Sequence, residues 1–417
     1  MKYQAVKGMK DILPGEIEAW QALESYTRRF LEAYGFREIR TPILESTELL
    51  VRSIGEASDI VHKEMYTFND RGGRSLTMRP EMTASVVRAA IEHNLIQKDE
   101  PLFLYYIGSM YRAERPQAGR KREFYQIGVE TINTHSIVND AELIIMVKHY
   151  LEGLGLKQFS VKLNNLGTEE DRAKYATRLQ EYFKTHQNKL CPDCGFRLSK
   201  NVLRIFDCKV ESCRPVIDEA PGIELSGKIA DDFKKLTNLL TNAKVPYKIE
   251  KKLVRGLDYY TGSVFEVTSE SGLGSQDALL AGGRYDGLIS SLGGPKIGAS
   301  GFALGIERLL MVLEASQISL TKQILNDSVY IAALVENEAS CEFYRQIADE
   351  LVRTHKRAHY SFGGKNLGNH LKRASKLGVR YALIVGEDEY KNAEVTVKDM
   401  TSGEQKRIKV KELGKAF

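Results

Sequence analysis

The pattern of apolar and polar residues predicts helices and strands in both halves of the chain. Residues 16–34 carry apolar side chains at helical spacing and end at Gly35, so they predict an amphipathic helix. Residues 102–114 and 123–132 are rich in aromatic and β-branched residues, which is typical of strands. A polar loop joins these two segments, and we therefore expect a long antiparallel hairpin. Helical spacing returns at residues 139–154.

The residue pattern of the sequence changes at two places, which predicts that the chain consists of three structural regions. Residues 168–250 are charged and helical, and glycine-punctuated, strand-like sequence follows them. We therefore expect a mainly helical insertion at 168–250 within a discontinuous α+β domain formed by residues 1–167 and 251–321. At residues 326–417, three apolar strand-like segments alternate with two helical segments, which predicts a separate small α/β domain.

Composition and charge narrow the class of protein only slightly. The chain has 60 basic and 55 acidic residues, so a nucleic-acid site would have to come from clustered basic residues. The N-terminal segment lacks the apolar core of a secretory signal, and no apolar run reaches the about 18 residues that span a bilayer. Four of the five cysteines lie close together, unlike a disulfide framework. We therefore expect a cytoplasmic protein without membrane association.

Alternate residues of the predicted hairpin share a face and carry groups suited to a ligand. They are Phe124, Gln126, Gly128 and Glu130 on the second strand, and Met110, Arg112 and Glu114 on the first. If the two faces coincide, an arginine, two carboxylates and an amide stand around a glycine. Buried carboxylates are unfavourable unless they are paired or bound to a ligand. A solvated outer face carries the same residues without any function, so alternation alone leaves both interpretations open.

Basic residues and glycines supply the remaining candidate chemistry. The hairpin loop holds Arg115, Arg120, Lys121 and Arg122, which suit the phosphates of ATP or RNA but also suit a solvated turn. The glycine-rich stretches at 281–287 and 298–305 match neither the P-loop pattern nor a GxGxxG that follows a strand. An ATP-dependent enzyme with this sequence would therefore use neither a Walker nor a Rossmann site.

Four cysteines have the spacing of a possible metal site. Cys191, Cys194, Cys208 and Cys213 form the pattern C-x2-C-x13-C-x4-C. Four thiolates at such spacing are typical of structural zinc sites. Reduced thiols and a disulfide remain the alternatives.

Three segments, in order, resemble the motifs of class II aminoacyl-tRNA synthetases. They are residues 35–56, built around Pro42, residues 111–126, with Arg112 and Phe124, and residues 298–309, with Arg308. The HIGH and KMSKS signatures of class I enzymes are absent from the sequence. Residues 253–266 and 281–289 are similar to the two signatures of histidyl-tRNA synthetases, and residues 77–88 and the opening KGMKDILP also fit that family.

This resemblance implies a fold and a reaction. The expected fold is α+β, with a class II antiparallel-sheet catalytic domain, the helical insertion and a C-terminal α/β anticodon-binding domain. The expected reaction joins L-histidine to tRNA(His) through a histidyl-adenylate, with release of AMP and pyrophosphate. The resemblance further implies magnesium bound with ATP, and a homodimer. By its match to the second motif, Arg112 would bridge the substrate carboxylate and the α-phosphate. By its match to the histidine-specific signature, Arg255 would lie opposite Arg112. Both are the expected catalytic residues.

The resemblance also assigns binding residues. For histidine they are Glu81, Thr83, Arg112, Gln126, Glu130, Arg255, Tyr259, Tyr260 and Tyr285. For ATP they are Arg112, Glu114, Arg120, Phe124 and Arg308, and for the acceptor end of the tRNA they are Gln117 and Arg122. Candidates for tRNA contact in the C-terminal domain are Lys365, Lys372, Arg373 and Lys376. The alternative for the three tyrosines is ordinary aromatic packing, and most helices display basic residues without any nucleic acid.

Two other functions compete with this one. A catalytically silent paralogue that senses histidine would commonly lack the anticodon-binding domain and the signature around Arg255, and this chain keeps both. An RNA-binding protein without catalysis would leave the ATP and amino-acid motifs unexplained.

Overall fold

The structure is a computed structural model. It describes residues 3–56, 58–117, 119–269, 271, 273, 278–321, 328–335, 338–354, 356–361 and 366–415. The chain divides into two compact units, Met1–Asp11 with Glu24–Ile318, and Ile12–Leu23 with Ser319–Phe417. Across the described part, no helix has the length and apolar character needed to cross a membrane. The limits of the catalytic domain, the insertion and the anticodon-binding domain that the sequence indicates stay predictions.

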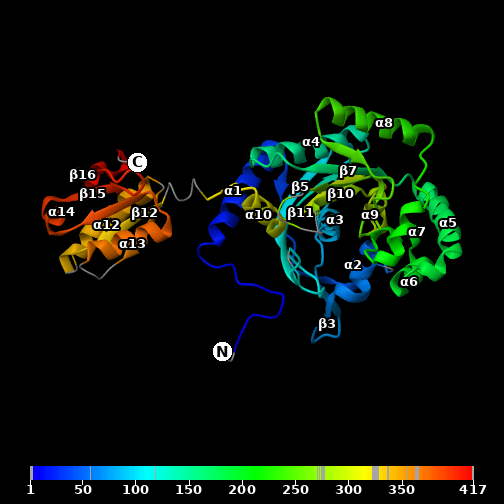
Figure 1. Ribbon diagram of the computed structural model, residues 1–417, viewed down its shortest axis with the longest axis horizontal. Coiled ribbons are helices and arrows are strands. Elements are labelled where there is room, and N and C mark those ends of the chain that lie inside the picture. The colour runs from blue at the N-terminus through cyan, green and yellow to red at the C-terminus, as the bar shows by residue number, and fades with distance from the viewer. Residues whose placement is uncertain are drawn as a thin grey trace. The chain divides into compact units, whose positions relative to one another are not determined.

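An eight-stranded sheet forms the centre of the larger unit (Figure 1). In spatial order its strands are β1 (Arg37–Glu38), β5 (Leu102–Tyr111), β6 (Glu123–Ile132), β11 (Ala299–Gly305), β10 (Ala278–Arg284), β9 (Thr261–Thr268), β7 (Ser160–Asn165) and β8 (Tyr247–Ile249). The edge pairs β1–β5 and β7–β8 are parallel, and the other neighbours are antiparallel. The predicted hairpin is confirmed as β5 and β6, although its first strand ends at Tyr111, before Arg112.

Helices cover one face of this sheet. The predicted N-terminal helix is α1 (Ile17–Ala33), and Gly35 follows it with a φ of +83°. Thr27 of α1 hydrogen-bonds Tyr150 of α4 (Ile137–Gly153) at 2.7 Å, and α10 (Ile306–Ala315) packs against β6. Because side chains alternate along a strand, Gln126 and Glu130 lie on the face of β6 opposite to Ile127 and Val129.

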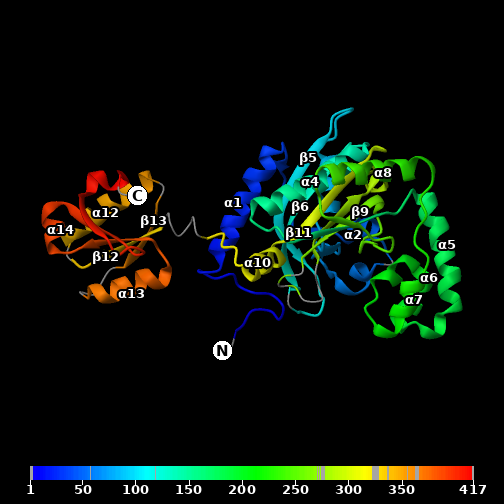
Figure 2. The ribbon, with the colours of Figure 1, turned by 45° about the horizontal axis from the view of Figure 1, so that its top comes forward.

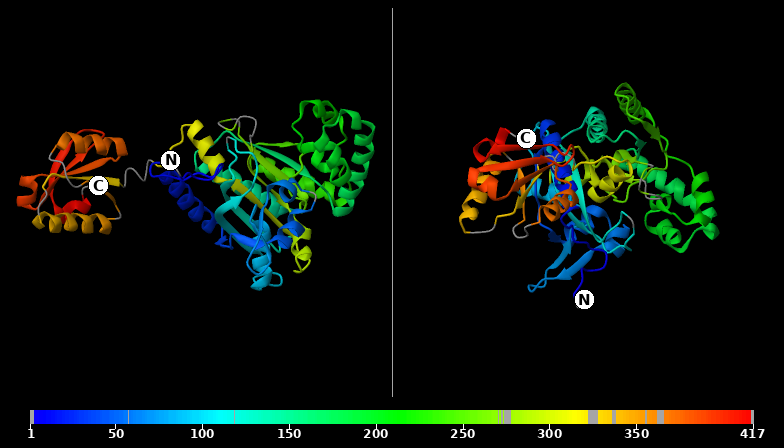
Figure 3. Two further views of the ribbon diagram at one scale, coloured as in Figure 1. Left: turned by 90° about the horizontal axis from the view of Figure 1, so that it is seen from below. Right: turned by 60° about the vertical axis from the view of Figure 1, so that its left-hand side comes forward.

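The region predicted as an insertion is mainly helical. It contains α5 (Glu169–Thr185), α6 (Pro192–Lys200), α7 (Arg214–Glu219), α8 (Gly227–Asn242) and the short turns η2 (Gln187–Lys189), η3 (Val202–Asp207) and η4 (Glu211–Cys213). Figure 3 shows these segments in green beside the sheet. Sequence analysis did not predict that its last residues form β8, which extends the central sheet.

A smaller sheet and four short helices complete the larger unit. The sheet has the order β2 (Leu44–Ser46), β4 (Ser75–Met78) and β3 (Tyr66–Asn69). The helices are α2 (Thr47–Ile54), η1 (Ile60–Glu64), α3 (Thr83–Glu92) and α9 (Asp286–Ser291). Figure 2 shows α2 below the strands of the central sheet. The Ser46 side chain accepts a hydrogen bond from the amide of Leu49 at 3.3 Å and so caps α2.

The C-terminal unit has its own five-stranded sheet. Its order is β13 (Arg357–Ser361), β12 (Ser328–Ala333), β14 (Tyr381–Val385), β15 (Glu394–Asp399) and β16 (Gln405–Lys409). With α12 (Glu338–Arg353) and α13 (Leu367–Leu377), the first three strands form the predicted parallel β-α-β-α-β series. The segments α14 (Glu387–Asn392), β15, β16 and η5 (Val410–Lys415) were not predicted. Lys372, Arg373 and Lys376 are exposed on α13, and Lys365 lies outside the described residues.

A buried ion pair ties β10 to α4. Arg284 donates from Nε to Asp140 Oδ2 at 3.1 Å and from Nη2 to Asp140 Oδ1 at 2.5 Å. Its Nη1 also donates to the carbonyl of Thr134 at 2.8 Å. Both charged residues are less than a tenth exposed. Arg284 Nη1 also pairs with the half-exposed Asp286 at 3.0 Å, but loss of Asp140 would remove the buried carboxylate that compensates most of the Arg284 charge.

We expect Asp140→Ala to lower the free energy of unfolding of the larger unit by about 3–5 kcal/mol, because Arg284 would keep its charge in a buried site. Urea denaturation followed by circular dichroism measures this loss. The control is Glu170→Ala, which removes an exposed ion pair with Lys174 and should cost less than about 1 kcal/mol. Equal midpoints for the two variants would contradict a structural role of the buried pair.

Candidate active site

A cavity of about 1340 Å³ opens over the central sheet of the larger unit. Its walls come from the ends of β5 and β6, from β9, β10 and β11, from residues 253–260 and from the insertion. Thirteen of the residues that the family resemblance assigned line it. They are Glu81, Thr83, Arg112, Glu114, Gln117, Arg120, Phe124, Gln126, Glu130, Arg255, Tyr259, Tyr260 and Arg308. Two assigned residues, Arg122 and Tyr285, do not line it.

A buried carboxylate lies at one end of the cavity. Glu130 of β6 is 1% exposed, and it accepts hydrogen bonds from Thr83 Oγ1 at 2.7 Å and from the Tyr285 hydroxyl. Tyr285 therefore does not line the cavity itself, and it contributes to the site through its hydrogen bond to Glu130. Burial raises the pKa of Glu130 to about 8, since it outweighs the two hydrogen bonds that favour the ionised form. Without a ligand, this carboxyl group is largely protonated at neutral pH.

A second carboxylate caps the helix beside it. Glu81 accepts from the backbone amides of Thr83 at 2.7 Å and Ala84 at 3.0 Å, at the N-terminus of α3. Burial raises the pKa of Glu81, and these amide donors and Arg112 oppose that shift. The helix end thereby orients a carboxylate toward the cavity.

Two glycines make room for this arrangement. A Cβ atom on Gly301 would lie 2.2 Å from Glu130 Oε2, and a Cβ atom on Gly128 would lie 1.9 Å from the ring of Tyr106. Any larger residue at these positions would displace the Glu130 carboxylate or Tyr106. Gly301, in the glycine-rich stretch at 298–305, thus permits the close approach of the Glu130 side chain.

Tyr106 is a cavity residue that the sequence analysis missed. It faces Gly128 across the β5–β6 pair and lies two positions before Gly108 and four before Met110, on the same face. Extending the alternation of Arg112 and Met110 toward the start of the strand would have identified Tyr106.

Four polar atoms of cavity-lining residues lack a protein partner. Among the residues that the structure describes, they are Tyr106 Oη, Gln126 Oε1, Arg204 Nε and Arg255 Nε, which are buried without a hydrogen bond. Buried polar groups are nearly always satisfied by protein, water or ligand. These atoms therefore mark positions where a polar ligand, or water in its absence, completes the site.

Arginines from separate parts of the chain meet in the same cavity. Arg112 donates from Nε to the carbonyl of Pro80 at 2.9 Å, and its guanidinium lies 5.2 Å from the centre of the Phe124 ring. Arg255 donates from Nη1 to Glu266 Oε2 at 3.0 Å. These contacts fix both guanidinium groups and leave other donors free for a ligand.

A second group of charges surrounds Arg308. Its Nε donates to the carbonyl of Gly119 at 3.0 Å and its Nη1 to that of Ala278 at 2.8 Å. Burial lowers the pKa of Arg308, and the neighbouring Arg120 lowers it further. Arg120 in turn donates to Glu114 Oε2 at 3.1 Å. Two close arginines with one carboxylate between them favour an anionic ligand.

The hairpin loop turns at Gln117 and ends beside the N-terminal segment. The backbones of Gln117 and Arg120 form a bridge with bonds of 3.0 and 2.9 Å. Arg122 donates to the carbonyl of Lys7 at 3.3 Å, and its amide donates to the carbonyl of Gly8 at 2.8 Å. Arg122 is therefore held outside the cavity.

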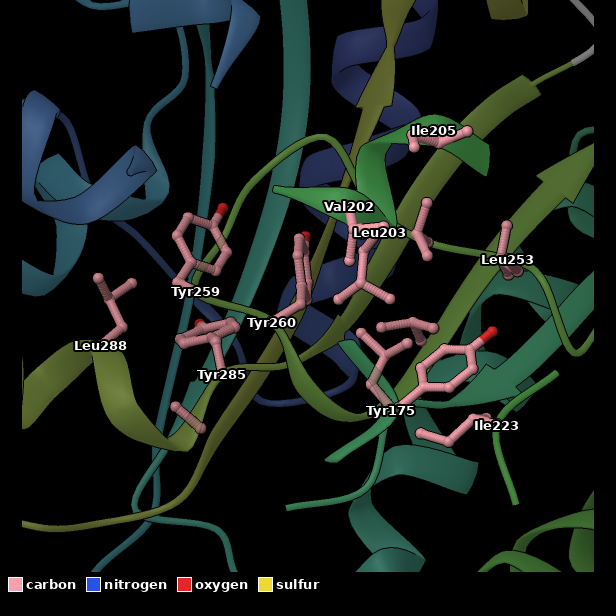
Figure 4. Close-up of a cluster of buried hydrophobic side chains, with 14 of the residues drawn as sticks. Tyr175, Val202, Leu203, Ile205, Ile223, Leu253, Tyr259, Tyr260, Tyr285 and Leu288 are labelled. Carbon is pink, nitrogen blue, oxygen red and sulfur yellow. The ribbon is translucent and has the colours of Figure 1, made fainter. Parts of the chain in front are cut away.

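The tyrosines form an aromatic cluster. The ring centres of Tyr259 and Tyr260 are 4.8 Å apart, and that of Tyr285 lies 5.6 and 6.4 Å from them. Figure 4 shows the three rings together, with Leu203 of the insertion nearby. All three rings belong to one buried core, so aromatic packing holds them in place. Tyr259 and Tyr260 also face the cavity.

Side chains of the insertion hold the loop of residues 253–260. Arg204 Nη1 donates to the carbonyl of Arg255 at 2.9 Å, and Arg172 Nη1 donates to the carbonyl of Tyr260 at 2.7 Å. Asn201 Nδ2 donates to Asp258 Oδ1 at 2.8 Å. Sequence analysis missed these residues because bonds to backbone carbonyls leave no recognisable pattern.

The four cysteines lie together in the insertion. Cys191, Cys194, Cys208 and Cys213 are all free thiols, which rules out the disulfide alternative in this structure. Cys208 also lines the cavity.

Comparisons with known proteins identify the family of this chain. The family model described as "Histidyl-tRNA synthetase" matches residues 8–309, and an "Anticodon binding domain" model matches residues 328–417. A "Histidine--tRNA ligase" of Syntrophotalea carbinolica is 43% identical over 419 residues, which cover 100% of this chain and 98% of the relative. Another, of Aquifex aeolicus, is 43% identical and covers 99% of this chain and 100% of the relative.

Solved structures show the same similarity. Apo histidyl-tRNA synthetase of S. aureus matches with a TM-score of 0.79 and 33% identity, over 100% of this chain and 99% of that one. An ATP phosphoribosyltransferase regulatory subunit/histidyl-tRNA synthetase of Bacillus halodurans shares the fold, with a TM-score of 0.64 at 24% identity, over 89% of this chain and 97% of that one. From the matched models and the relatives of equal length, this chain belongs to the histidyl-tRNA synthetase family.

Proposed function

We propose that this chain activates L-histidine with ATP and transfers it to tRNA(His), with release of pyrophosphate and then AMP. One observation carries the proposal: a buried carboxylate, Glu130, and two fixed arginines, Arg112 and Arg255, line one cavity. A carboxylate suits the N–H of an imidazole, and the arginines suit a carboxylate and a phosphate.

Recognition of histidine rests on the end of the cavity around Glu130. The ionised carboxylate accepts the imidazole N–H, while Thr83 and Tyr285 keep it oriented. The other proposed histidine-binding residues are Glu81, Arg112, Gln126, Arg255, Tyr259 and Tyr260. An apolar competitor would leave these buried polar groups unpaired, which permits discrimination by about 10⁴-fold without editing.

Activation rests on the arginines. As the histidine carboxylate attacks the α-phosphate of ATP, negative charge grows on that phosphate, and fixed cations stabilise it. We assign this role to Arg112 and Arg255. The remaining proposed ATP-binding residues are Glu114, Arg120, Phe124 and Arg308, with Phe124 against the adenine and Arg308 at the γ-phosphate.

Class II aminoacyl-tRNA synthetases generally use ATP with Mg²⁺, and we propose the same here. Among the described residues, the one group of three or more potential metal ligands is the cysteine cluster, so the cavity offers no preformed carboxylate cage. Mg²⁺ usually keeps waters and takes substrate phosphates with one or two carboxylates. The residues therefore fit a magnesium ion that is held mainly by the nucleotide and neutralises its phosphates.

The tRNA is the second substrate. We assign its acceptor end to Gln117 and Arg122 of the hairpin loop, and its anticodon to the C-terminal unit, which matches the anticodon-binding model. The exposed basic residues Lys372 and Lys376 of α13 support this assignment. The bacterial relatives support the further proposal of a cytoplasmic enzyme.

ATP–pyrophosphate exchange with each of the twenty amino acids tests the proposal. We expect exchange with histidine alone. Arg255→Ala should reduce it by about 10²–10³-fold, because a fixed cation is lost at the reacting phosphate. Lys174→Ala, on an exposed face of the insertion, should leave the rate unchanged. A folded protein that binds histidine but exchanges with no amino acid would instead support the histidine-sensing paralogue.

Histidine binding should release protons near pH 7.5. Burial raises the pKa of Glu130 to about 8, so about three-quarters of these groups carry a proton in the empty site at that pH, whereas the complex needs the ionised form. Calorimetry in two buffers of different ionisation enthalpy measures the release. Glu130→Gln should abolish it. Proton uptake by the unmodified protein, or equal release by the variant, would contradict the assignment.

We also propose a homodimer that buries the segment resembling the class II interface motif. Ile43, just before β2, is 43% exposed, Leu44 in β2 is 41% exposed, and Phe68 of β3 in the same small sheet is 46% exposed. Several exposed apolar side chains on one small sheet favour an interface. We expect Leu44→Asp to shift sedimentation from dimer to monomer, and Ile249→Asp on the edge strand β8 to leave it unchanged. A monomeric unmodified protein would overturn the proposal.

A further inference from the structure

Four sulfur atoms from three short elements of the insertion converge on one point. Cys191 precedes α6 and Cys194 lies in its first turn, whereas Cys208 follows η3 and Cys213 ends η4. All four Sγ atoms lie within 4.8 Å of one another. Three of these residues are buried and Cys191 is partly buried, so the cluster is enclosed by protein.

The spacing of the sulfurs fits a metal better than a disulfide. Zn–S bonds of about 2.3 Å in a tetrahedron place the sulfurs about 3.8 Å apart, whereas a disulfide needs about 2.05 Å. The Cys191 and Cys208 sulfurs are 3.8 Å apart. Unliganded cysteines pack as small apolar residues and have no need to point at one another.

Backbone amides also point at the sulfurs. The amide of Cys191 donates to Cys213 Sγ at 3.1 Å, and the amide of Val210 donates to Cys208 Sγ at 3.4 Å. Donors of this kind stabilise the negative charge that thiolates carry when they bind a metal. They are a second feature, independent of the distances, that suits charged sulfurs.

We propose that Cys191, Cys194, Cys208 and Cys213 bind one structural Zn²⁺ ion. Four thiolates leave no open position for a substrate, so the site is structural rather than catalytic. Carboxylates are absent from the group, and thiolates select zinc over magnesium.

The proposed ion would stabilise the residues that hold the loop of Arg255. Between Cys194 and Cys208, the chain carries Asn201 and Arg204, which bond Asp258 and the carbonyl of Arg255. Arg204 is also held by Asp207, at 2.8 Å, directly before Cys208. A metal that fixes both ends of this segment therefore limits the movement of a wall of the cavity.

Metal analysis of the purified full-length protein tests the proposal, with a readout that does not depend on catalysis. We expect about one zinc per chain. After removal of the metal by a chelator, Co²⁺ should restore one equivalent and produce the charge-transfer and ligand-field bands of a tetrahedral four-thiolate site. Less than about a tenth of an equivalent after purification and after incubation with zinc would overturn the proposal in favour of reduced thiols.

Matched substitutions locate the ion. Cys194→Ser and Cys208→Ser should each reduce bound zinc at least about tenfold and lower the melting temperature. Cys341→Ser, at the one cysteine of the sequence outside the cluster, should retain the full equivalent. If zinc persists in both cluster variants or disappears in the control, the assignment to these four residues is wrong. If a cluster variant fails to fold, the chelator and cobalt measurements on the unmodified protein decide.

Discussion

The architecture of the cavity depends on burying one carboxylate. Glu130 lies in the middle of the central sheet, where an uncompensated charge is strongly unfavourable. Thr83 reaches it from the start of α3, and Tyr285 reaches it from the start of α9, so two helix ends must be fixed for one side chain. Gly301 must lack a side chain for the same reason. Segments far apart in sequence are therefore constrained together by a single group whose charge a ligand can stabilise.

Support for the opposite wall comes from the insertion. Residues 253–260 form neither helix nor strand, so no regular hydrogen-bond ladder holds Arg255 in place. Arg172 and Arg204 satisfy the carbonyls of this loop instead, and the core of the insertion is continuous with that of Tyr260 and Tyr285. The insertion is thus part of the structural basis of the cavity, and its stability affects the position of Arg255.

Sequence predicted much of the fold and part of the site, for identifiable reasons. Strand periodicity placed Phe124, Gln126 and Glu130 on one face because alternation is local and survives folding. Strand periodicity could not reveal Arg204, because its role depends on a hydrogen bond to the carbonyl of Arg255, 51 residues away. The resemblance assigned Tyr285 to histidine binding, yet Tyr285 lies behind Glu130 and does not line the cavity. A motif indicates that a residue is near a site but not which of its atoms face the ligand.

The distribution of charge distinguishes an activating enzyme from a protein that only binds histidine. A histidine sensor needs the end of the cavity around Glu130 but gains nothing from arginines at the other end. There, Arg308 is partly buried beside Arg120; burial and that neighbouring charge lower the pKa of Arg308, and Glu114 offsets only part of this effect. Such an arrangement costs stability unless an anion offsets it. A polyphosphate carries enough negative charge to offset it, whereas histidine brings a single carboxylate. The two arginines, with Glu114 beside them, therefore favour the proposal that this end of the cavity binds the phosphates of ATP.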